Sequence, residues 1–339
     1  MPPASSLVYV ILSEYQLLAA FSEHLAPLLP ADASVHDAGC GPRLLSVCSL
    51  APYSAFRFHR ASAEMAVVNA LLIPGRIEIN KSKEKLPPPL MTARTQHINA
   101  AEYDRMIAVS DLHGRLDQFE RLLAAVHFSE RDLLLLLGDY IERGPQSLAL
   151  LHRIMTLTAE GRACALMGNC DNLLEDVFHP RYRGDLLRYL SRHPQTILHE
   201  MLAAQGTAFS QKTTQEEIRH VVAEHYAEER EFLQSLPHII DAGDYIFVHA
   251  GLDDVPLSLQ DPERCLKRSD FYQTAPAFSK TIVLGHMPCQ RLSRDGSGAP
   301  VFDAKRNLVF IDGGVGLVEG AAMNALLIAD GRLRVCSVP

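Results

Sequence analysis

The sequence has 339 residues, with 40 Asp and Glu against 32 Lys and Arg, a formal net charge of −8 and 47% hydrophobic residues. This length suits one large α/β domain or two medium ones. The negative charge argues against a protein that binds nucleic acid by neutralising phosphate backbones. The 7 cysteines form no Cys-x-x-Cys pair, which predicts neither a disulfide framework nor a zinc knuckle and fits a cytoplasmic location. No apolar run reaches the ~18 residues of a membrane span.

The charges are unevenly divided along the chain. Residues 1–100 hold 8 basic and 7 acidic side chains, whereas residues 101–339 hold 24 and 33. We expect residues 1–100 to form a poorly defined N-terminal extension, with a solvated linker at 81–90. This extension is not translated at all if synthesis starts at Met91 or Met106. A small accessory domain is the alternative.

From Met106 onward, short apolar runs alternate with helical patterns. The predicted strands and helices follow one another as Met106–Ser110 (strand), Leu116–Val126 (helix), Asp132–Leu137 (strand), Pro145–Ala159 (helix) and Ala163–Met167 (strand). Strand, loop and helix in repetition are typical of parallel βαβ units. In the leucine-rich run Asp132–Leu137, apolar and polar residues do not alternate, which predicts a strand buried on both faces.

The second half continues with a helical section and further strands. Residues 173–236 have a mostly helical pattern, and Tyr245–Val248 and Thr281–Leu284 are predicted strands. Asn307–Ile311 and Ala325–Ile328 are expected to close the fold.

Five of the predicted strands are followed by residues that can bind a metal ion. These residues are Asp111, His113, Asp139, Asn169, His249 and His286. The carboxyl ends of strands in an open α/β sheet meet in one crevice, so we expect these side chains to converge. One aspartate after a strand is usually a turn or helix-cap residue, but six candidate ligands at successive strand ends are hard to explain in that way. Carboxylate, imidazole and amide oxygen suit a pair of Mn, Fe or Zn ions that share one carboxylate.

The motifs that carry these residues resemble those of the calcineurin-like metallophosphoesterase superfamily, and more narrowly bacterial members of its phosphoprotein-phosphatase branch. They are Asp111-Leu-His113-Gly114, Gly138-Asp139-Tyr-Ile-Glu142-Arg143-Gly144, Gly168-Asn169-Cys170-Asp171, His249-Ala-Gly251 and Gly285-His286. The resemblance implies an α/β fold for residues 101–339, namely the four-layer αββα sandwich of this superfamily, with a helical cap inserted at about residues 173–240.

The resemblance also implies a role for each site residue. Asp111 and His113 would bind the first metal ion, Asp139 would bridge, and the second ion would be bound by Asn169, His249 and His286. The two divalent ions are expected to be Mn, with Fe, Zn or Ni as alternatives. Arg143 would hold the substrate phosphate, because its planar guanidinium suits bidentate contact. Arg268 is expected to be a second phosphate-binding arginine, and Lys267 is its alternative.

Two positions depart from the superfamily pattern, and both concern the proton donor. Related enzymes keep a histidine, held by an aspartate, that protonates the leaving group; here these positions are Cys170 and Glu142. A thiol is a poor general acid at neutral pH, and general acid help is worth ~10²- to 10⁴-fold in rate. We therefore expect hydrolysis to favour good leaving groups, unless Asp171 or His179 supplies the proton. A covalent or redox role for the thiol is a lesser alternative.

The sequence as a whole predicts a hydrolase. The first expectation is a phosphomonoesterase of the serine/threonine phosphatase type, acting on a phosphorylated small molecule or a phosphoprotein through a hydroxide activated by two metal ions. A phosphodiesterase or dinucleotide polyphosphate hydrolase is the alternative. A phosphate-binding regulatory protein that has lost turnover is the alternative from another class. No membrane partner is expected, and no nucleic acid beyond a nucleotide substrate.

Overall fold

The computed structural model describes residues 92–179 and 185–339 with their side chains, and five strands within residues 8–82 by their backbone. The chain divides into two compact units, Met1–Pro87 and Pro88–Pro339. The domain boundary near residue 100 and the alternative starts stay predictions. Met91 and most of the predicted linker lie outside the described residues.

The first unit contains one antiparallel sheet whose strands pair in chain order. Its members are β1 (Val8–Leu12), β2 (Arg43–Leu50), β3 (Tyr53–Arg60), β4 (Val67–Ile73) and β5 (Arg76–Ser82).

The second unit contains two sheets. The first has the order β16-β15-β7-β8-β9, in which β7, β8 and β9 run parallel and β15 runs antiparallel to β7. Its strands are β7 (Arg105–Val109), β8 (Asp132–Leu136), β9 (Ala163–Ala165), β15 (Met323–Ala329) and β16 (Arg332–Val338). The predicted βαβ units are therefore confirmed.

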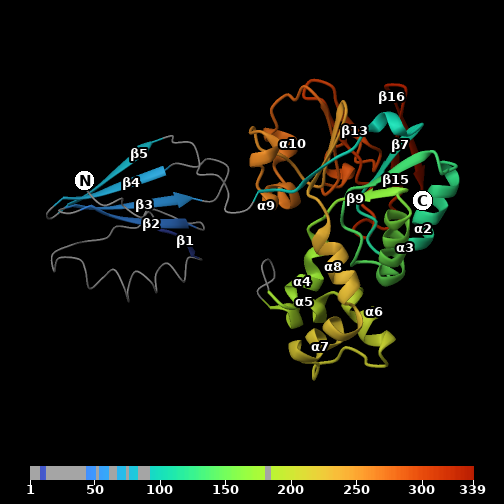
Figure 1. Cartoon of the computed structure of the whole chain (residues 1–339), viewed down its shortest axis with the longest axis horizontal. Helices are drawn as coiled ribbons and strands as arrows, with labels where there is room; N and C mark the ends of the chain where they lie inside the picture. Colours follow the sequence, from blue (N-terminus) through green and yellow to red (C-terminus); the bar gives the residue numbers. More distant parts are fainter. Residues whose placement is uncertain are drawn as a thin grey trace. The chain divides into compact units, whose positions relative to one another are not determined.

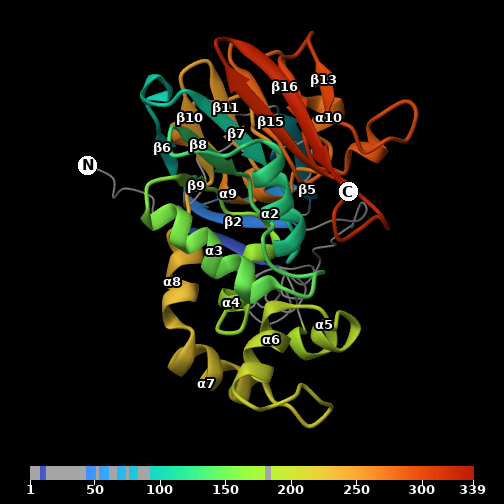
Figure 2. The ribbon, with the colours of Figure 1, turned by 90° about the vertical axis from the view of Figure 1, so that its right-hand side faces the viewer.

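The second sheet has the order β13-β14-β12-β11-β10-β6, with β11, β12 and β14 parallel to one another. Its strands are β6 (Thr95–His97), β10 (Ile239–Ala242), β11 (Tyr245–Val248), β12 (Thr281–Leu284), β13 (Val301–Asp303) and β14 (Leu308–Phe310). The two sheets pack face to face, with β7 and β8 in front of β10 and β11 in the view of Figure 2.

The core explains why β8 has no polar alternation. Leu133 and Leu135 pack between the two sheets against residues such as Phe247 and Val283. The neighbouring side chains of β8 face the helices on the other side of the sheet. All five residues of this strand are buried, so its sequence reads as one apolar run apart from Asp132.

Helices cover both outer faces, which gives the predicted αββα sandwich (Figures 1 and 2). The longer helices on the first sheet are α2 (Leu116–Ala125) and α3 (Ser147–Ala159), and the second sheet packs against α9 (Pro262–Lys267) and α10 (Phe271–Thr274). Short 3-10 turns lie at Ala100–Glu102, Cys170–Asn172, Leu257–Leu259 and Cys289–Arg291. Among the described residues, none of the helices has the length and apolarity to cross a membrane.

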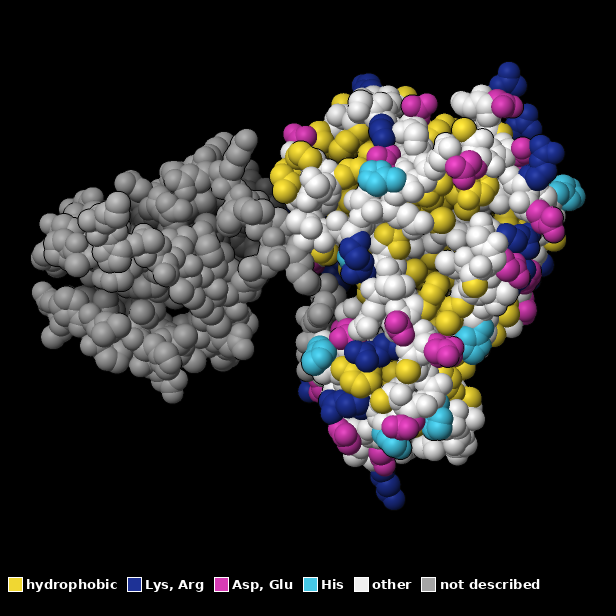
Figure 3. Space-filling view, in the orientation of Figure 1, with side chains coloured by type: hydrophobic (Ala, Val, Ile, Leu, Met, Phe, Trp, Pro, Cys, Tyr) yellow, Lys and Arg dark blue, Asp and Glu magenta, His cyan; other side chains and the backbone are white. Residues whose placement is uncertain are grey.

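Five helices between β9 and β10 form a separate lobe below the sandwich in Figure 1, which we call the cap. They are α4 (Leu173–Asp176), α5 (Leu186–Arg192), α6 (Ile197–Ala204), α7 (Gln215–His225) and α8 (Ala227–Ser235). Their apolar side chains join those of α3 in one continuous cluster. Histidines are spread over this lobe in Figure 3 and do not gather in a patch.

The cap is joined to the sandwich by polar contacts as well. Glu200 of α6 accepts hydrogen bonds from the main-chain N–H groups of Ser147 and Leu148, both at 2.8 Å. These are orphan donors at the start of α3, so the carboxylate acts as an N-cap supplied from the cap. The main-chain N–H of Arg143 also donates to the carbonyl of Gln195 at 2.6 Å.

Candidate active site

Strand ends bring the predicted ligands together. Asp111 and His113 follow β7, Asp139 follows β8, and Asn169 follows β9, all at the carboxyl ends of parallel strands. From the second sheet, His249 follows β11 and His286 follows β12. The two sheets thus bring both sets of loops to one edge of the sandwich.

The backbone is strained at this edge. Of the nine non-glycine residues with positive φ in the described part of the chain, six belong to the predicted site: Asp111, His113, Asp139, Glu142, Arg143 and His286. Such conformations are costly for residues with a Cβ and cluster at functional sites, where surrounding structure holds them.

The side chains of His249, Asn169 and Asp139 converge in the site. The Nδ1 of His249 lies 2.7 Å from the carbonyl oxygen of Leu137, which can only accept, so Nδ1 carries the hydrogen and Nε2 has a lone pair. That Nε2 lies 3.1 Å from the Oδ1 of Asn169 and 3.5 Å from the Oδ1 of Asp139. With a neutral ring, this imidazole nitrogen, the amide oxygen and the carboxylate form a donor set that fits a divalent metal ion.

A second group of possible ligand atoms surrounds the same carboxylate. Asp111, Asp139 and His249 place ligand atoms within 4.8 Å of one another, and so do His113, Asp139 and Cys170. The Nε2 of His113 lies 3.8 Å from the Oδ2 of Asp139. Asp139 belongs to both groups, as a bridging ligand should. The ring of His286 lies beside His249, with centroids 5.1 Å apart.

Electrostatics in the site also fit a metal centre. Burial, together with the nearby carboxylate of Asp139, raises the pKa of Asp111 well above its ordinary value. Burial alone would raise the pKa of Asp139, but the imidazoles of His249 and His113 lower it. Burial also lowers the pKa of His113 and of His286 to about 4, which keeps both rings neutral and able to bind a metal.

The side chain of Asp171 binds the backbone of the predicted metal-binding loops. Its carboxylate accepts hydrogen bonds from the main-chain N–H groups of Gly168 at 2.8 Å, Asp139 at 2.7 Å and Tyr140 at 2.8 Å. Burial, with the neighbouring Asp139, raises its pKa to about 7. These contacts give Asp171 a positioning role and do not direct it at a substrate.

Close approach of the loops depends on two glycines. A Cβ on Gly285 would overlap the side chains of Ser110 and Asp111, and a Cβ on Gly168 would overlap Asp139. Both glycines belong to the motifs quoted above, and each lets one loop pack directly on a ligand from another strand.

The two altered positions of the proton donor lie in the same buried region. Cys170 is 1% exposed, and burial raises the pKa of its thiol well above the ordinary value. Its main-chain N–H donates to Asp139 Oδ1 at 2.8 Å, so the residue still orients the bridging carboxylate. Glu142 is fully buried and accepts a hydrogen bond from the hydroxyl of Tyr189 at 2.9 Å. A proton-donor or redox role for Cys170 stays a prediction.

The two predicted phosphate-binding arginines differ in their surroundings. Arg143 lines a cavity of about 210 Å³, and within the described residues no hydrogen bond or ion pair engages its guanidinium. Arg268 donates to Asp253 at 2.8 Å and to the carbonyl of Leu252, and lies 3.4 Å from Asp270. These contacts occupy its guanidinium, so a role of Arg268 or Lys267 in phosphate binding stays a prediction.

The sequence analysis missed several residues near the site. Asp312 is buried, and burial together with Asp111 raises its pKa well above the ordinary value. It lies in Phe310-Ile-Asp312-Gly-Gly314, a motif whose buried strand followed by two glycines could have indicated a further site residue. Tyr189 and His193 come from the cap, and no local pattern in the sequence marks them.

The fold and this site define a metallophosphoesterase. A family model of calcineurin-like phosphoesterases matches residues 105–318, more than half of the chain. The chain belongs to the calcineurin-like phosphoesterase family.

Curated relatives match over shorter stretches. A symmetrical bis(5'-nucleosyl)-tetraphosphatase of Acidovorax ebreus is 36% identical over 106 residues, which are 26% of this chain and 37% of the relative. The protein of the same name from Acidovorax sp. is 48% identical over 67 residues, 20% of this chain and 23% of the relative. The matched stretches therefore span less than two fifths of these relatives. A solved protein serine/threonine phosphatase from Saccharomyces cerevisiae has 13% identity and a TM-score of 0.46, over 72% of this chain and 82% of that one.

Proposed function

We propose that this protein hydrolyses the central phosphoanhydride of dinucleoside tetraphosphates and releases two nucleoside diphosphates. Two observations support the proposal: the names of the curated relatives, and the buried thiol of Cys170 where a proton donor is expected. A nucleoside diphosphate leaves on a weakly basic phosphate oxygen and needs no general acid. An alkoxide does need one, so a phosphoanhydride suits this site better than an alkyl phosphomonoester.

We assign the metal ligands as the sequence predicted them. Asp111, His113 and Asp139 would hold one divalent ion, and Asp139, Asn169, His249 and His286 the other. Divalent ions, when bound, supply Lewis acidity and lower the pKa of water. We propose Mn as the ion, with Fe, Zn or Ni as alternatives that elemental analysis of the purified protein distinguishes.

The chain's own groups would orient the substrate. Arg143 faces the cavity with its donors unpaired in the described structure, and it would bind two oxygens of the phosphoryl group under attack. A water oxygen would then form the new bond to phosphorus and lose its proton to solvent, while the bridging P–O bond breaks and its electron pair stays on the departing diphosphate. Asp171 and Cys170 keep Asp139 in place: the Asp171 carboxylate accepts from the main-chain N–H of Asp139, and the main-chain N–H of Cys170 donates to the Asp139 carboxylate.

The test compares three substrates with the Mn-loaded protein: diadenosine tetraphosphate, p-nitrophenyl phosphate and bis-p-nitrophenyl phosphate. We expect ADP as the sole nucleotide product and the highest kcat/KM on the tetraphosphate. ATP and AMP as products, or a higher kcat/KM on the monoester, would overturn the proposal. No turnover on any substrate with metal bound would favour the phosphate-binding regulator.

Serine/threonine phosphatase-like activity on phosphomonoesters or phosphoproteins takes second place in this proposal, because the thiol of Cys170 cannot replace an imidazolium. A cytoplasmic location stays a prediction that cell fractionation can check.

A further inference from the structure

We propose that His193 and Arg192 of the cap, together with Arg143, form an extended subsite for a chain of phosphates. The inference rests on the proposed function and adds to it the part of the site that recognises the phosphates beyond the one under attack.

The cavity beside Arg143 lies between the loop after β8 and the cap. It is lined by Glu142, Arg143, Tyr189, Arg192, His193, Pro194, Gln195 and Gly316. Gly316 places one wall against the metal site, since a Cβ there would lie 2.9 Å from the Cβ of His113 and 3.1 Å from that of Arg143. The inner end of the cavity therefore adjoins a predicted metal ligand, and the rest is made by residues of the cap.

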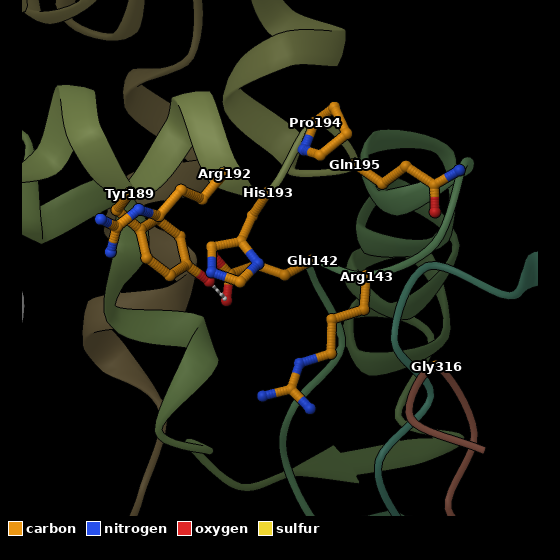
Figure 4. Close-up of a pocket in the computed structure, with 8 residues that line it drawn as sticks. All are labelled: Glu142, Arg143, Tyr189, Arg192, His193, Pro194, Gln195 and Gly316. Atoms are coloured by element: carbon orange, nitrogen blue, oxygen red, sulfur yellow. Dashed lines mark hydrogen bonds between the residues drawn. The ribbon is translucent and has the colours of Figure 1, made fainter.

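The basic side chains that line this cavity are shown in Figure 4. In this view the His193 ring lies between Arg143 and the Tyr189 ring, and the Arg192 side chain overlaps Tyr189. The Arg192 and His193 side chains are exposed, and no hydrogen bond or ion pair holds Arg192 in the described part of the chain. Two guanidinium groups and an imidazole, all of which can donate hydrogen bonds to phosphate oxygens, match a polyphosphate chain, whereas a phosphomonoester would need only Arg143.

Three contacts fix the position of His193. The His193 ring packs on the Tyr189 ring, with centroids 4.4 Å apart, and the Tyr189 hydroxyl donates to the buried carboxylate of Glu142. Pro194 follows, and α5 ends before His193, whose φ of −125° and ψ of 84° lie outside the helical region. The next residue, Gln195, receives the hydrogen bond from the main-chain N–H of Arg143.

These contacts also account for Glu142. Among the described residues that line the cavity, Glu142 is the acidic one, and its side chain is fully buried. Its carboxylate holds the Tyr189 ring on which His193 packs. The arrangement assigns Glu142 and Tyr189 as positioning residues for His193.

The test measures binding of inorganic phosphate and of tripolyphosphate to the metal-loaded protein by calorimetry. His193→Ala and Arg192→Ala should each weaken tripolyphosphate binding about 10-fold, because each removes a contact to a charged group, and leave phosphate binding within about 2-fold. Arg188→Ala, an exposed arginine one turn earlier on α5, and His220→Ala, an exposed histidine on α7, are matched controls that should change neither.

Turnover provides a second readout. The two variants should lower kcat/KM for diadenosine tetraphosphate about 10-fold and leave p-nitrophenyl phosphate unchanged. Equal losses on both substrates, or unchanged tripolyphosphate binding, would overturn the subsite. Preferential tripolyphosphate binding that the variants abolish, without turnover of the tetraphosphate, would support the subsite and contradict the proposed reaction. Equal wild-type affinity for phosphate and tripolyphosphate would overturn the subsite itself.

Discussion

The carboxylate of Asp171 accepts a hydrogen bond from the main-chain N–H of Asp139 at 2.7 Å. This contact joins the loop after β9 to the loop after β8 and fixes the backbone of the proposed bridging ligand. Metal affinity should therefore depend on a residue that need not touch the metal.

Asp171→Asn should weaken Mn binding by about 10- to 100-fold, the usual cost of losing a group that orients a ligand. The amide would turn an N–H toward donors where the carboxylate accepted three hydrogen bonds. Calorimetric titration of the metal-free protein measures the change. Asp254→Asn, an exposed residue, is the control, and unchanged affinity in Asp171→Asn would contradict the assigned role.

Arg143→Ala should lower kcat/KM by about 10²-fold on any phosphoryl substrate and leave metal content unchanged, since charged hydrogen bonds are worth ~1.5–3 kcal/mol each. Arg143→Lys should recover only part of the loss, because an ammonium cannot make the bidentate contact. Steady-state kinetics and elemental analysis check both statements. A variant that loses its metal would show instead that Arg143 acts through the metal site.

Cys170→Ser should keep turnover of diadenosine tetraphosphate within about 3-fold. The thiol is buried and burial raises its pKa, so it donates no proton, while the main-chain N–H that contacts Asp139 is retained. The same burial predicts that iodoacetamide alkylates Cys170 slowly, and mass spectrometry of peptides measures the rate. Rapid alkylation, or a rate loss of more than about 10²-fold, would return the thiol to a catalytic role.

Removal of metal should lower the melting temperature, because the carboxylates of Asp111 and Asp139 then face each other without a neutralising ion. Burial and this repulsion are what raise the pKa of Asp111. Differential scanning calorimetry with and without chelator measures the shift, and added Mn should reverse it. Asp139→Asn should show little or no shift, because it removes the proposed bridging ligand.

Asp132→Asn should reduce the free energy of unfolding by about 1–3 kcal/mol at neutral pH. Burial would raise the pKa of Asp132, but hydrogen bonds from Arg105, at 2.6 and 2.8 Å, and from Ser129 lower it. The carboxylate therefore stabilises the fold above its unfolded pKa of about 3.9, and this contribution is lost as pH falls through the lower folded value.

Urea unfolding of wild type and Asp132→Asn at pH 7 and pH 3 tests the sign of this effect. The difference between the two proteins should shrink at the lower pH. Glu130→Gln, on the exposed side of the same loop, should give no difference at either pH, and a gap that widens in acid would contradict the assignment.

The residues at the strand ends were predictable because each follows a short buried run directly. His249, for example, comes one residue after β11, and Asp111 comes two residues after β7, so local apolar patterns located both. β6 was missed because its three residues, Thr95–His97, are polar or exposed and pair only at the edge of a sheet.

The cap side of the site could not be predicted in the same way. His193 approaches Arg143 through a backbone contact between Gln195 and Arg143, which are 52 residues apart in sequence, and no periodicity records such a pairing. The positive φ of Arg143 could not be predicted either, because local propensity disfavours it for an arginine and only tertiary contacts impose it.

The contacts that join the cap to the sandwich affect how the substrate range of the site can evolve. Tyr189 donates to Glu142, and Gln195 accepts from the main-chain N–H of Arg143, so both ends of the cap segment that borders the cavity contact the loop after β8. Glu200 adds a third contact where it caps α3. The cap segment is therefore a wall of the cavity. Replacing residues on this wall would alter which phosphate compounds enter while the metal-binding edge keeps its geometry, so substrate range and catalytic chemistry can evolve separately.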